Sequence, residues 1–337
     1  IRFEGNSYHL ITSIGMSEYP SESDNANALV RHSSMALSRA RERGGNCYDS
    51  YDSIMSVRLS KRWAVEEKLR KALDNQEFTL NYHPIVNPQD GGVIGVESLL
   101  RWDDPERGRI FPDQFIPVLE ETGMIIPVGE WVLYESCHQL HLWQEQHNKS
   151  LRLNVNISPK QLDDPQFLQK LARILKGTGI APQQLCLEIT ENVLLGHSAK
   201  TLDTLTGIGE LGVNLYIDDF GTGFSSMTYL KRLPVNGLKI DKSFIDDIPD
   251  DANSTAIALA ILNLGRDMKL QVIPEGVETA EQANFLANSG ADLVQGFYFS
   301  KPLPAAHIGK LLERNAKLPT TLPPLVSEHR LYNTRNH

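Results

Sequence analysis

Several short apolar runs in this sequence carry one polar or charged residue close to their C-terminal ends. These residues are Glu97, Asn156, Glu188, Asp218, Lys239, Glu275 and Gln295, and Asp219 directly follows Asp218. A buried carboxylate without a partner is very costly, so each residue taken alone could be part of a core ion pair or a capping group. The set contains five carboxylates and one lysine. One ammonium cannot neutralise them all, and we therefore expect a further source of positive charge.

Divalent cations would supply that charge. Oxygen ligands from Asp, Glu and Asn suit hard ions such as Mg²⁺ or Mn²⁺. No histidine lies at a matching strand end, and Cys47, Cys137 and Cys186 lack metal-site spacing, which disfavours a zinc site. The carboxylates suffice for two ions, which together can hold a phosphoryl group and activate water for in-line attack. Lys239 would then orient that water or offset charge in the transition state.

Asp218 and Asp219 pose a geometric question, because side chains alternate between the two faces of a strand. Both carboxylates can face one site only if the strand stops between them. Gly221 and Gly223 follow and permit backbone angles that other residues resist, so the loop can bend around the site. The letters DFG at 219–221 also occur in protein kinases. However, this chain has no HRD loop and no glycine-rich loop followed by a VAIK-type lysine, so we reject a kinase.

The elements that must position these residues follow a repeating pattern from residue 78 onwards. Strands are expected at 78–86, 93–100, 151–157, 184–190, 213–218, 237–241, 270–275 and 291–299, and helices at 113–121, 130–147, 165–176, 200–211, 254–268 and 279–289. Eight strands alternating with helices over about 240 residues predict an α/β fold, a (β/α)₈ barrel with its site at the C-terminal strand ends. An open doubly wound sheet is the alternative, but its glycine-rich fingerprint is absent. The NPQDGG turn suits a hairpin, so the first strand should be antiparallel.

The two ends of the chain have a different character. A strand at 9–16 and a helix at 26–43 form a small α+β fragment that cannot hold a core alone. A second helix at 54–75 is expected to join it to the barrel. The tail after residue 315 has three prolines and no periodicity, so we expect it to be flexible. Because the chain starts at Ile1 and not at methionine, we expect it to be part of a longer protein.

Composition limits the classes of function. The chain has 337 residues, 22% of them charged, and a formal net charge of −9, which argues against DNA or RNA polymers as partners. A small anionic substrate remains compatible once metals mask the carboxylates. The three cysteines suggest reduced thiols in the cytoplasm, and no apolar run approaches a membrane span. A membrane anchor in a missing N-terminal region of the parent protein is left open.

In combination, the motifs resemble those of the EAL-domain family, phosphodiesterases that linearise cyclic di-GMP to pGpG on a TIM-like barrel with a reversed first strand. The resemblance covers about residues 62–315. VESLLRW stands where the family has EALLRW, and the family's order continues with VNIS, LEITEN, DDFGTGFSS, LKIDKSFI, PEGVET and QGFYFSKPL. It implies two Mg²⁺ or Mn²⁺ ions, inhibition by Ca²⁺, and a homodimer formed through the barrel near the DDFGTG loop.

The resemblance also implies a role for each matching residue. The counterparts of the primary metal ligands are Glu97, Asn156, Glu188 and Asp218, and Asp219 resembles the ligand of the second metal. Lys239 is similar to the lysine beside the catalytic water, and Glu275 to the glutamate proposed as general base or holder of a metal-bound water. Substrate contacts are implied for Leu99, Arg101, Glu278 and Gln295, with Arg101 on the phosphate. Glu191 resembles the glutamate that steadies the loop after DDFGTG.

Three positions depart from the family pattern. Ser98 replaces the signature alanine, His83 replaces a glutamine and Pro274 replaces an alanine. We interpret His83 as a satisfied histidine, with an altered contact to a guanine as the alternative. Pro274 should stiffen the approach to Glu275. None of the three removes an expected metal ligand.

The first residues resemble the C-terminal part of a GGDEF domain without its signature loop. Ser34 and Arg41 stand where that family usually has Asp and Lys, and we expect no cyclase activity from this fragment. The predicted organisation is a GGDEF-like fragment at 1–52, a linker helix start at 53–61, an EAL barrel at 62–315 and a tail at 316–337. Further upstream GGDEF or sensory domains are expected in the parent chain.

Two functions remain in competition. One is metal-dependent hydrolysis of cyclic di-GMP to pGpG, which would lower this second messenger in bacterial signalling. The other is a receptor module that binds cyclic di-GMP without cleaving it. The complete set of expected ligands favours hydrolysis. A purely structural barrel would leave the acidic strand ends unexplained.

Overall fold

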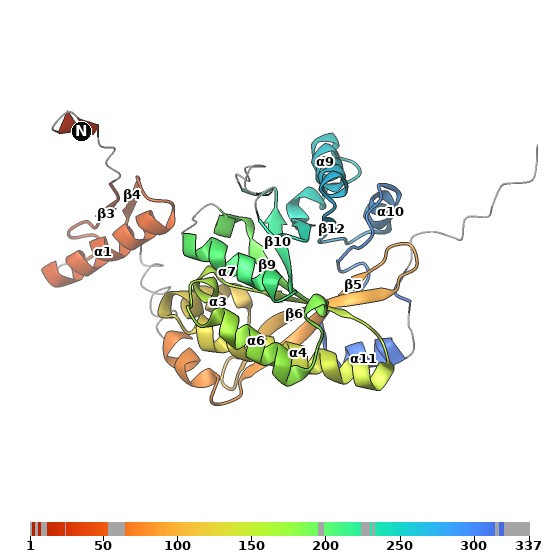
Figure 1. The fold of residues 1–337 in the computed structure, drawn as a ribbon. Coiled ribbons are helices and arrows are strands. Elements are labelled where there is room, and N and C mark those ends of the chain that lie inside the picture. Colours follow the sequence, from red (N-terminus) through yellow and green to blue (C-terminus); the bar gives the residue numbers. More distant parts are fainter. Residues whose placement is uncertain are drawn as a thin grey trace, which may run out of the picture. The chain divides into compact units, whose positions relative to one another are not determined.

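The computed structural model describes residues 2–3, 6–7, 12–23, 25–52, 65–194, 199–223, 230, 233–313 and 317–319. Residues 54–64 of the predicted helix at 54–75 lie outside these residues, and so do most of the predicted tail and the FSSM segment that follows Gly223. The chain divides into two compact units, Ile1–Ala72 and Leu73–His337, which are described separately (Figure 1).

The first unit contains a strand–helix–strand arrangement. β3 (Ile14–Met16) pairs in parallel with β4 (Tyr48–Ser50), and α1 (Ala26–Glu42) connects them. Asn25 caps α1 by accepting a hydrogen bond from the Asn27 amide. The helix lies very close to β3, since a Cβ added to Gly15 would fall 2.0 Å from the Ser33 carbonyl oxygen. The predicted α+β fragment is therefore present, although its first strand is shorter than expected. A small hairpin, β1 (Arg2–Phe3) with β2 (Asn6–Ser7), precedes it.

The second unit is built around a central, mostly parallel sheet. β5 (Phe78–Val86) pairs antiparallel with β6 (Val93–Asp104), as the short turn predicted. From β6 the parallel order continues through β8 (Arg152–Asn156), β9 (Leu185–Thr190), β10 (Asn214–Phe220), β11 (Gly237–Ile240) and β12 (Gln271–Pro274). The α/β fold class and the antiparallel first strand are confirmed.

The prediction of a last strand at 291–299 is wrong, because this segment does not form a regular strand. The structure has an isolated bridge instead, in which Val294 and Val86 exchange backbone hydrogen bonds of 2.9 and 3.0 Å. The Gln295 amide then donates to the Pro274 carbonyl at 3.0 Å. The segment therefore links β5 to β12 and closes the ring. It cannot continue as a strand, because Gly296 passes against the Val277 backbone, where a Cβ would meet a carbonyl oxygen at 2.1 Å.

In the second unit, two short strands were not predicted. β7 (Gly108–Ile110) pairs with the end of β6, which runs four residues further than expected. β13 (Leu303–Pro304) pairs antiparallel with β5. Neither strand has enough residues to produce an alternating pattern, which is why periodicity alone did not reveal them.

The helices lie around this sheet (Figure 1). They are α3 (Pro112–Thr122), α4 (Ile125–His147), α5 (Pro159–Leu162), α6 (Phe167–Thr178), α7 (Ala199–Glu210), α9 (Ala252–Met268), α10 (Ala280–Asn288) and α11 (Ala305–Glu313). Side-chain caps set several starts: Asp251 accepts from the Ser254 amide, and Thr279 from the Gln282 amide. Among the described helices, none has the length and apolar character needed to cross a bilayer.

The barrel interior has an apolar floor. Ile85, Cys186, Tyr216, Ile273 and Leu293 pack together there. Their strand neighbours point outward against the helices, as the alternation of side chains requires. This floor lies on the same inward face as the polar strand-end residues, which are therefore the next layer up.

Candidate active site

Strand register brings the polar residues to one end of the barrel. Asn156 on β8 lies beside Glu188 on β9, and Glu97 on β6 lies opposite His83 on β5. Glu188 is fully buried, and Glu97 is 6% exposed. Because Leu187 and Ile189 face the helices, the intervening Glu188 must face the barrel interior.

Lys239 lies at the centre of the cluster and is 1% exposed. Its ammonium nitrogen is 2.6 Å from Glu275 Oε1 and 2.9 Å from Glu188 Oε2. It is also 3.3 Å from Glu97 Oε2 and 3.4 Å from Asp218 Oδ1. Burial alone would lower the pKa of Lys239, but the surrounding carboxylates, Asp218 foremost, raise it well above its usual value. The lysine is thus a charged group shared by four acids.

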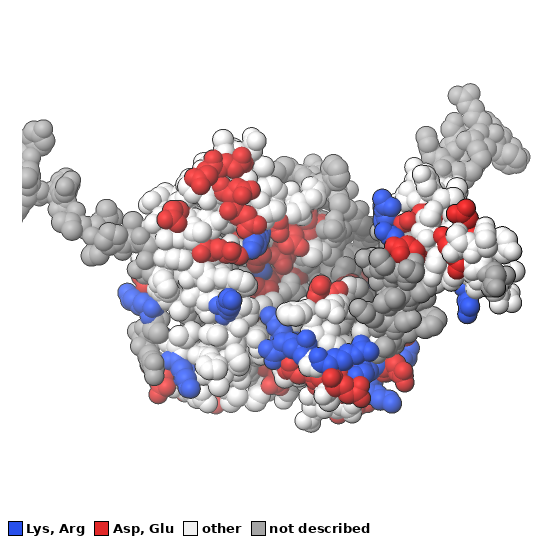
Figure 2. Space-filling model, turned by 180° about the vertical axis from the view of Figure 1, so that it is seen from behind, with Lys and Arg blue, Asp and Glu red and all other residues white. Residues whose placement is uncertain are grey.

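One ammonium leaves this cluster short of positive charge. Burial raises the pKa of Glu188 to about 8, and Lys239 only partly offsets that effect. Burial also raises the pKa of Glu275 well above its ordinary value, assisted by repulsion from Asp218 and Glu97. A hollow with gathered acidic side chains is visible on the surface in Figure 2. The centre therefore favours the binding of further cations.

Two amides hold Glu97 in place. Asn156 Nδ2 donates to Glu97 Oε1 at 2.7 Å, and Gln295 Nε2 donates to Glu97 Oε2 at 3.0 Å. The other amide atom of Gln295, Oε1, is buried and has no hydrogen-bond partner within the part of the chain that the structure describes. An unpaired buried acceptor beside a carboxylate is suited to a cation or to a water that a cation holds.

Asp218 and Asp219 both reach the site, but not in the way the sequence suggested. We expected the strand to end at Asp218, whereas β10 continues to Phe220 with a register irregularity between Ile217 and Phe220. Asp219 has a φ of 53°, a left-handed conformation that aspartate tolerates better than most residues. This bulge cancels the alternation and turns both side chains to one side. Oxygen atoms of Asp218, Asp219 and Glu275 lie within 4.8 Å of one another.

The residues present fit hard divalent cations. The donor set consists of carboxylate and amide oxygens, it carries excess negative charge, and it includes the unpaired Gln295 oxygen. Mg²⁺ and Mn²⁺ prefer such ligands. Burial, followed by repulsion from Asp218 and contact with Asp241, raises the pKa of Asp219 to about 6. Asp241 is thus a further carboxylate beside the cluster that sequence reasoning missed.

The predicted substrate contacts lie at varied distances from this centre. Leu99 and Arg101 follow Glu97 on the same face of β6, and both are half-buried. The Arg101 guanidinium donates to the Leu100 carbonyl at 2.9 Å, and burial lowers its pKa. Glu278 is not brought into the carboxylate cluster, because its Oε1 forms an ion pair of 2.5 Å with Lys242.

Glu191 holds the loop that follows β10. It is 2% exposed, and its Oε2 accepts hydrogen bonds from the Gly221 amide at 2.9 Å and the Gly223 amide at 3.2 Å. The loop therefore starts from a fixed point, although its next residues lie outside the described part of the chain. This contact is the geometry that the predicted loop-steadying role requires.

The departures from the family pattern have local explanations. Ser98 Oγ accepts a hydrogen bond of 2.9 Å from Ser136 Oγ on α4, so its hydroxyl faces the helices and not the site. His83 Nε2 lies 3.0 Å from the Ser300 carbonyl oxygen, and burial lowers the pKa of this histidine. Pro274 ends β12, and its carbonyl oxygen takes part in closing the ring.

Sequence reasoning also missed Asn154. Its Nδ2 donates to Glu188 Oε1 at 2.7 Å, and the residue is 2% exposed. The signal was available, since Asn154 precedes Asn156 by two positions and must share its face of β8.

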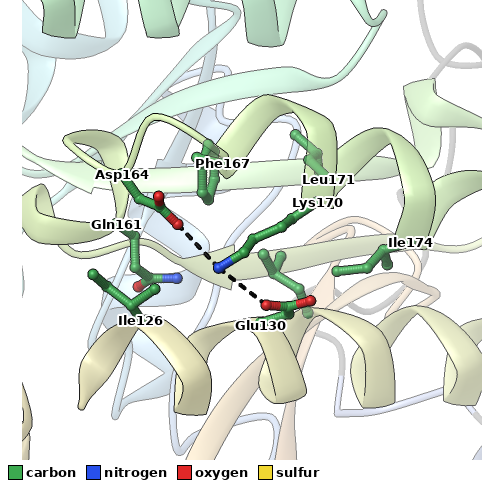
Figure 3. Close-up of a pocket in the computed structure, with 9 residues that line it drawn as sticks. Ile126, Glu130, Gln161, Asp164, Phe167, Lys170, Leu171 and Ile174 are labelled. Carbon is green, nitrogen blue, oxygen red and sulfur yellow. Dashed lines mark hydrogen bonds and ion pairs between the residues drawn. The ribbon is translucent and has the colours of Figure 1, made fainter. Parts of the chain in front are cut away.

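A second crevice lies in the outer helical layer, between α4 and α6. Figure 3 shows Lys170 there, between Asp164 at 3.0 Å and Glu130 at 3.2 Å, with Phe167 and Leu171 on its walls. One ammonium faces two carboxylates here, whereas one ammonium faces four at the strand ends. We therefore place the candidate site at the strand ends, where the excess of negative charge is larger.

Most of this chain is similar in sequence to known proteins. A family model described as "EAL domain" matches residues 66–302. The bifunctional diguanylate cyclase/cyclic di-GMP phosphodiesterase MucR of Pseudomonas aeruginosa is 38% identical over 296 residues, which are 88% of this chain and 43% of that protein. The cyclic di-GMP phosphodiesterase NbdA of the same organism is 37% identical over 312 residues, or 93% of this chain and 40% of that protein.

A solved structure, the MucR phosphodiesterase in complex with c-di-GMP, is similar with a TM-score of 0.70 and 40% sequence identity. It covers 73% of this chain and 99% of the solved chain. Structures of the EAL enzyme Bd1971 are also similar, with a TM-score of 0.72 and 32% identity for its cAMP-bound form, covering 87% of this chain and 76% of that one. The chain spans about two fifths of the length of the curated relatives described here, 43% and 40%.

Proposed function

Because this chain belongs to the EAL-domain family, we propose that it hydrolyses cyclic di-GMP to linear pGpG with Mg²⁺ or Mn²⁺, and thereby lowers this second messenger in bacterial signalling. The observation that carries the proposal is the cluster of four carboxylates around the buried Lys239, three of them buried and Glu275 half-buried, with Asp219 beside it. Such a cluster can hold cations against a phosphodiester that an acidic protein would otherwise repel.

The ligands fall into two groups that share Asp218. Glu97, Asn156, Glu188 and Asp218 would hold one ion, and Asp219 with Asp218 and Glu275 would hold a second. When bound, the ions would polarise the phosphate and make water acidic enough to attack near neutral pH. Gln295 keeps Glu97 oriented through its hydrogen bond.

The chain's own groups would carry the remaining steps. Glu275 would accept a proton from the attacking water, and its carboxylate already contacts the Lys239 ammonium at 2.6 Å. Lys239 would offset the negative charge that grows on the phosphate as one P–O bond breaks. Arg101 would bind the phosphate through its guanidinium, with Leu99 beside the ligand. Glu278 would contact the substrate only after it leaves Lys242.

A turnover assay tests the proposal. The purified chain should convert cyclic di-GMP to pGpG with Mg²⁺ or Mn²⁺, and not with EDTA or Ca²⁺. Glu97→Ala should abolish turnover, whereas Glu210→Ala, at the exposed end of α7, should not. If the protein binds cyclic di-GMP with metal but does not cleave it, a receptor function replaces the enzyme.

We also propose the wider context of the chain. The first 52 residues would be the end of a GGDEF-like domain, preceded by sensory or GGDEF domains in the parent protein. The barrel would form a homodimer near the DDFGTG loop and act in the cytoplasm. Light scattering of the purified chain would test the dimer, and a monomer at micromolar concentration would contradict it.

A further inference from the structure

Asn154 lies directly beneath the carboxylate cluster. It is on β8, two residues before Asn156, and alternate residues of a strand share one face. It is 2% exposed, and its Nδ2 donates a hydrogen bond of 2.7 Å to Glu188 Oε1. A buried amide that donates to a carboxylate forms a strong, directional contact.

The two asparagines of β8 connect to the glutamates crosswise. By register, Asn154 lies beside Glu97 on β6, and Asn156 lies beside Glu188 on β9. The hydrogen bonds run the other way, from Asn156 to Glu97 and from Asn154 to Glu188. One strand thereby holds a glutamate on each of its two neighbours. Neither carboxylate can rotate without losing a bond to β8.

The contact distinguishes the two oxygen atoms of Glu188. Oε1 is taken by Asn154, whereas Oε2 lies 2.9 Å from Lys239 Nζ. The same ammonium contacts Glu97 and Asp218, so Oε2 faces the shared centre. With Oε1 occupied, Glu188 presents one oxygen to that centre and keeps the other out of it.

We propose that Asn154 is a positioning residue that turns Glu188 so that its Oε2 points to the metal ions. This rests on the proposed function, in which Glu188 is a ligand. Hydrogen bonds to ligating side chains fix their orientation, and their loss typically weakens metal binding or activity by about 10- to 100-fold. The hydrogen bond of the Asn154 side chain goes to Glu188, so its proposed role is exerted through that residue.

Calorimetric titration of Mn²⁺ into the substrate-free protein tests the inference. Asn154→Leu removes the donor at similar volume, and Asn154→Ser keeps a small polar group that is too short to reach Glu188. Both variants should bind Mn²⁺ more weakly, with a dissociation constant raised by about 10- to 100-fold. Asn214→Leu is the matched control, because that amide donates to the Gln183 carbonyl at 2.8 Å, away from the cluster. It should leave Mn²⁺ affinity within about twofold of the wild type, since it touches no ligand.

A second measurement separates positioning from general damage. At saturating Mn²⁺, the KM for cyclic di-GMP should be unchanged in Asn154→Leu while the Mn²⁺ requirement rises. The inference is overturned if Asn154→Leu folds cooperatively and binds Mn²⁺ with wild-type affinity. If Asn154→Leu does not fold, the Mn²⁺ affinity of Asn154→Ser is the test. If the wild type itself binds no Mn²⁺, the metal mechanism fails and this inference fails with it. If the wild type binds Mn²⁺ and the Asn154 variants bind it equally well, only the role of Asn154 is overturned.

Discussion

Replacement of Lys239 by methionine would remove the cation that three buried acids and the half-buried Glu275 share. The side chain is 1% exposed and contacts carboxylate oxygens at 2.6 to 3.4 Å. Methionine has a similar length and no charge, so the variant keeps most of the packing. The acids would then keep their amide hydrogen bonds but lose the ammonium that offsets their charge. Removing one member of a buried ion pair typically costs about 3–5 kcal/mol, because the remaining charge is uncompensated.

This loss should be large relative to the stability of the fold, which is about 5–15 kcal/mol for typical proteins. Divalent cations should restore part of it, since they supply the missing charge. A ligand at one hundred times its dissociation constant stabilises a folded protein by about 2.7 kcal/mol. Mn²⁺ should therefore recover roughly half or more of the lost stability. It should also stabilise Lys239→Met more than the wild type, because no ammonium competes for the same carboxylates.

Urea unfolding with EDTA and with Mn²⁺ provides the measurement, alongside turnover of cyclic di-GMP. We expect Lys239→Met to be inactive, destabilised in EDTA and partly restored by Mn²⁺. A variant within about 1 kcal/mol of the wild type in EDTA would refute the reasoning, because the four contacts would then be energetically unimportant. Lys170→Met is the control, since it removes a lysine that contacts two acids away from the strand ends.

Three further predictions concern residues around this centre. Lys170→Met should cost about 1 kcal/mol at neutral pH without changing turnover. Burial opposes ionisation of Asp164, but hydrogen bonds from the Gln166 amide and Lys170 outweigh that effect and lower the pKa of Asp164. The stability cost of Lys170→Met should therefore be present above about pH 4 and vanish as the pH falls through this lowered pKa. A constant cost down to pH 2 would contradict the ion pair. Ser98→Ala should cost about 1–2 kcal/mol by leaving the Ser136 hydroxyl unpaired, and Ser98→Ala with Ser136→Ala should cost less than the sum of the two single variants; a turnover loss in Ser98→Ala at full folding would place this hydroxyl in the site after all. Gly223→Pro removes an amide that donates a hydrogen bond to Glu191. Turnover should therefore fall strongly while the urea midpoint of unfolding changes little. A loss of turnover that merely follows a loss of stability would count against a role for the loop.

The sequence predicted the fold well wherever a strand was long enough to alternate. The hairpin of β5 and β6 and the parallel order after it followed from turn length and period. The failure at 291–299 has a physical cause. That segment is apolar because it closes the ring. Its backbone hydrogen bonds go to separate partners, from Val294 to Val86, from Gln295 to Pro274 and from Tyr298 to Val277, and not to one neighbouring strand. Hydrophobicity reports burial, and it does not report how many hydrogen bonds a buried segment makes.

The candidate site was predictable to the extent that strand ends converge in a barrel. That rule predicted convergence of Glu97, Glu188 and Asp218, and the structure brings them around one lysine. It did not foresee the bulge at Asp219, since a left-handed aspartate is a property of backbone geometry and not of residue order. Glu278 differs for another reason. Its ion pair with Lys242 depends on side-chain reach across a gap of 36 residues, which no local pattern encodes.

The lysine explains how so many acids can share one interior before any cation arrives. A folded chain without it would have to protonate these carboxylates or keep them apart, because isolated buried charges are strongly unfavourable. With Lys239 in the middle, these carboxylates are held together in the folded barrel. Asn156 and Asn154 then fix Glu97 and Glu188 from one strand. Glu191 anchors the loop that follows Asp218 and Asp219. Incoming ions would therefore bind ligands that are already positioned, and the ordering of those side chains would not have to be paid for at the binding step.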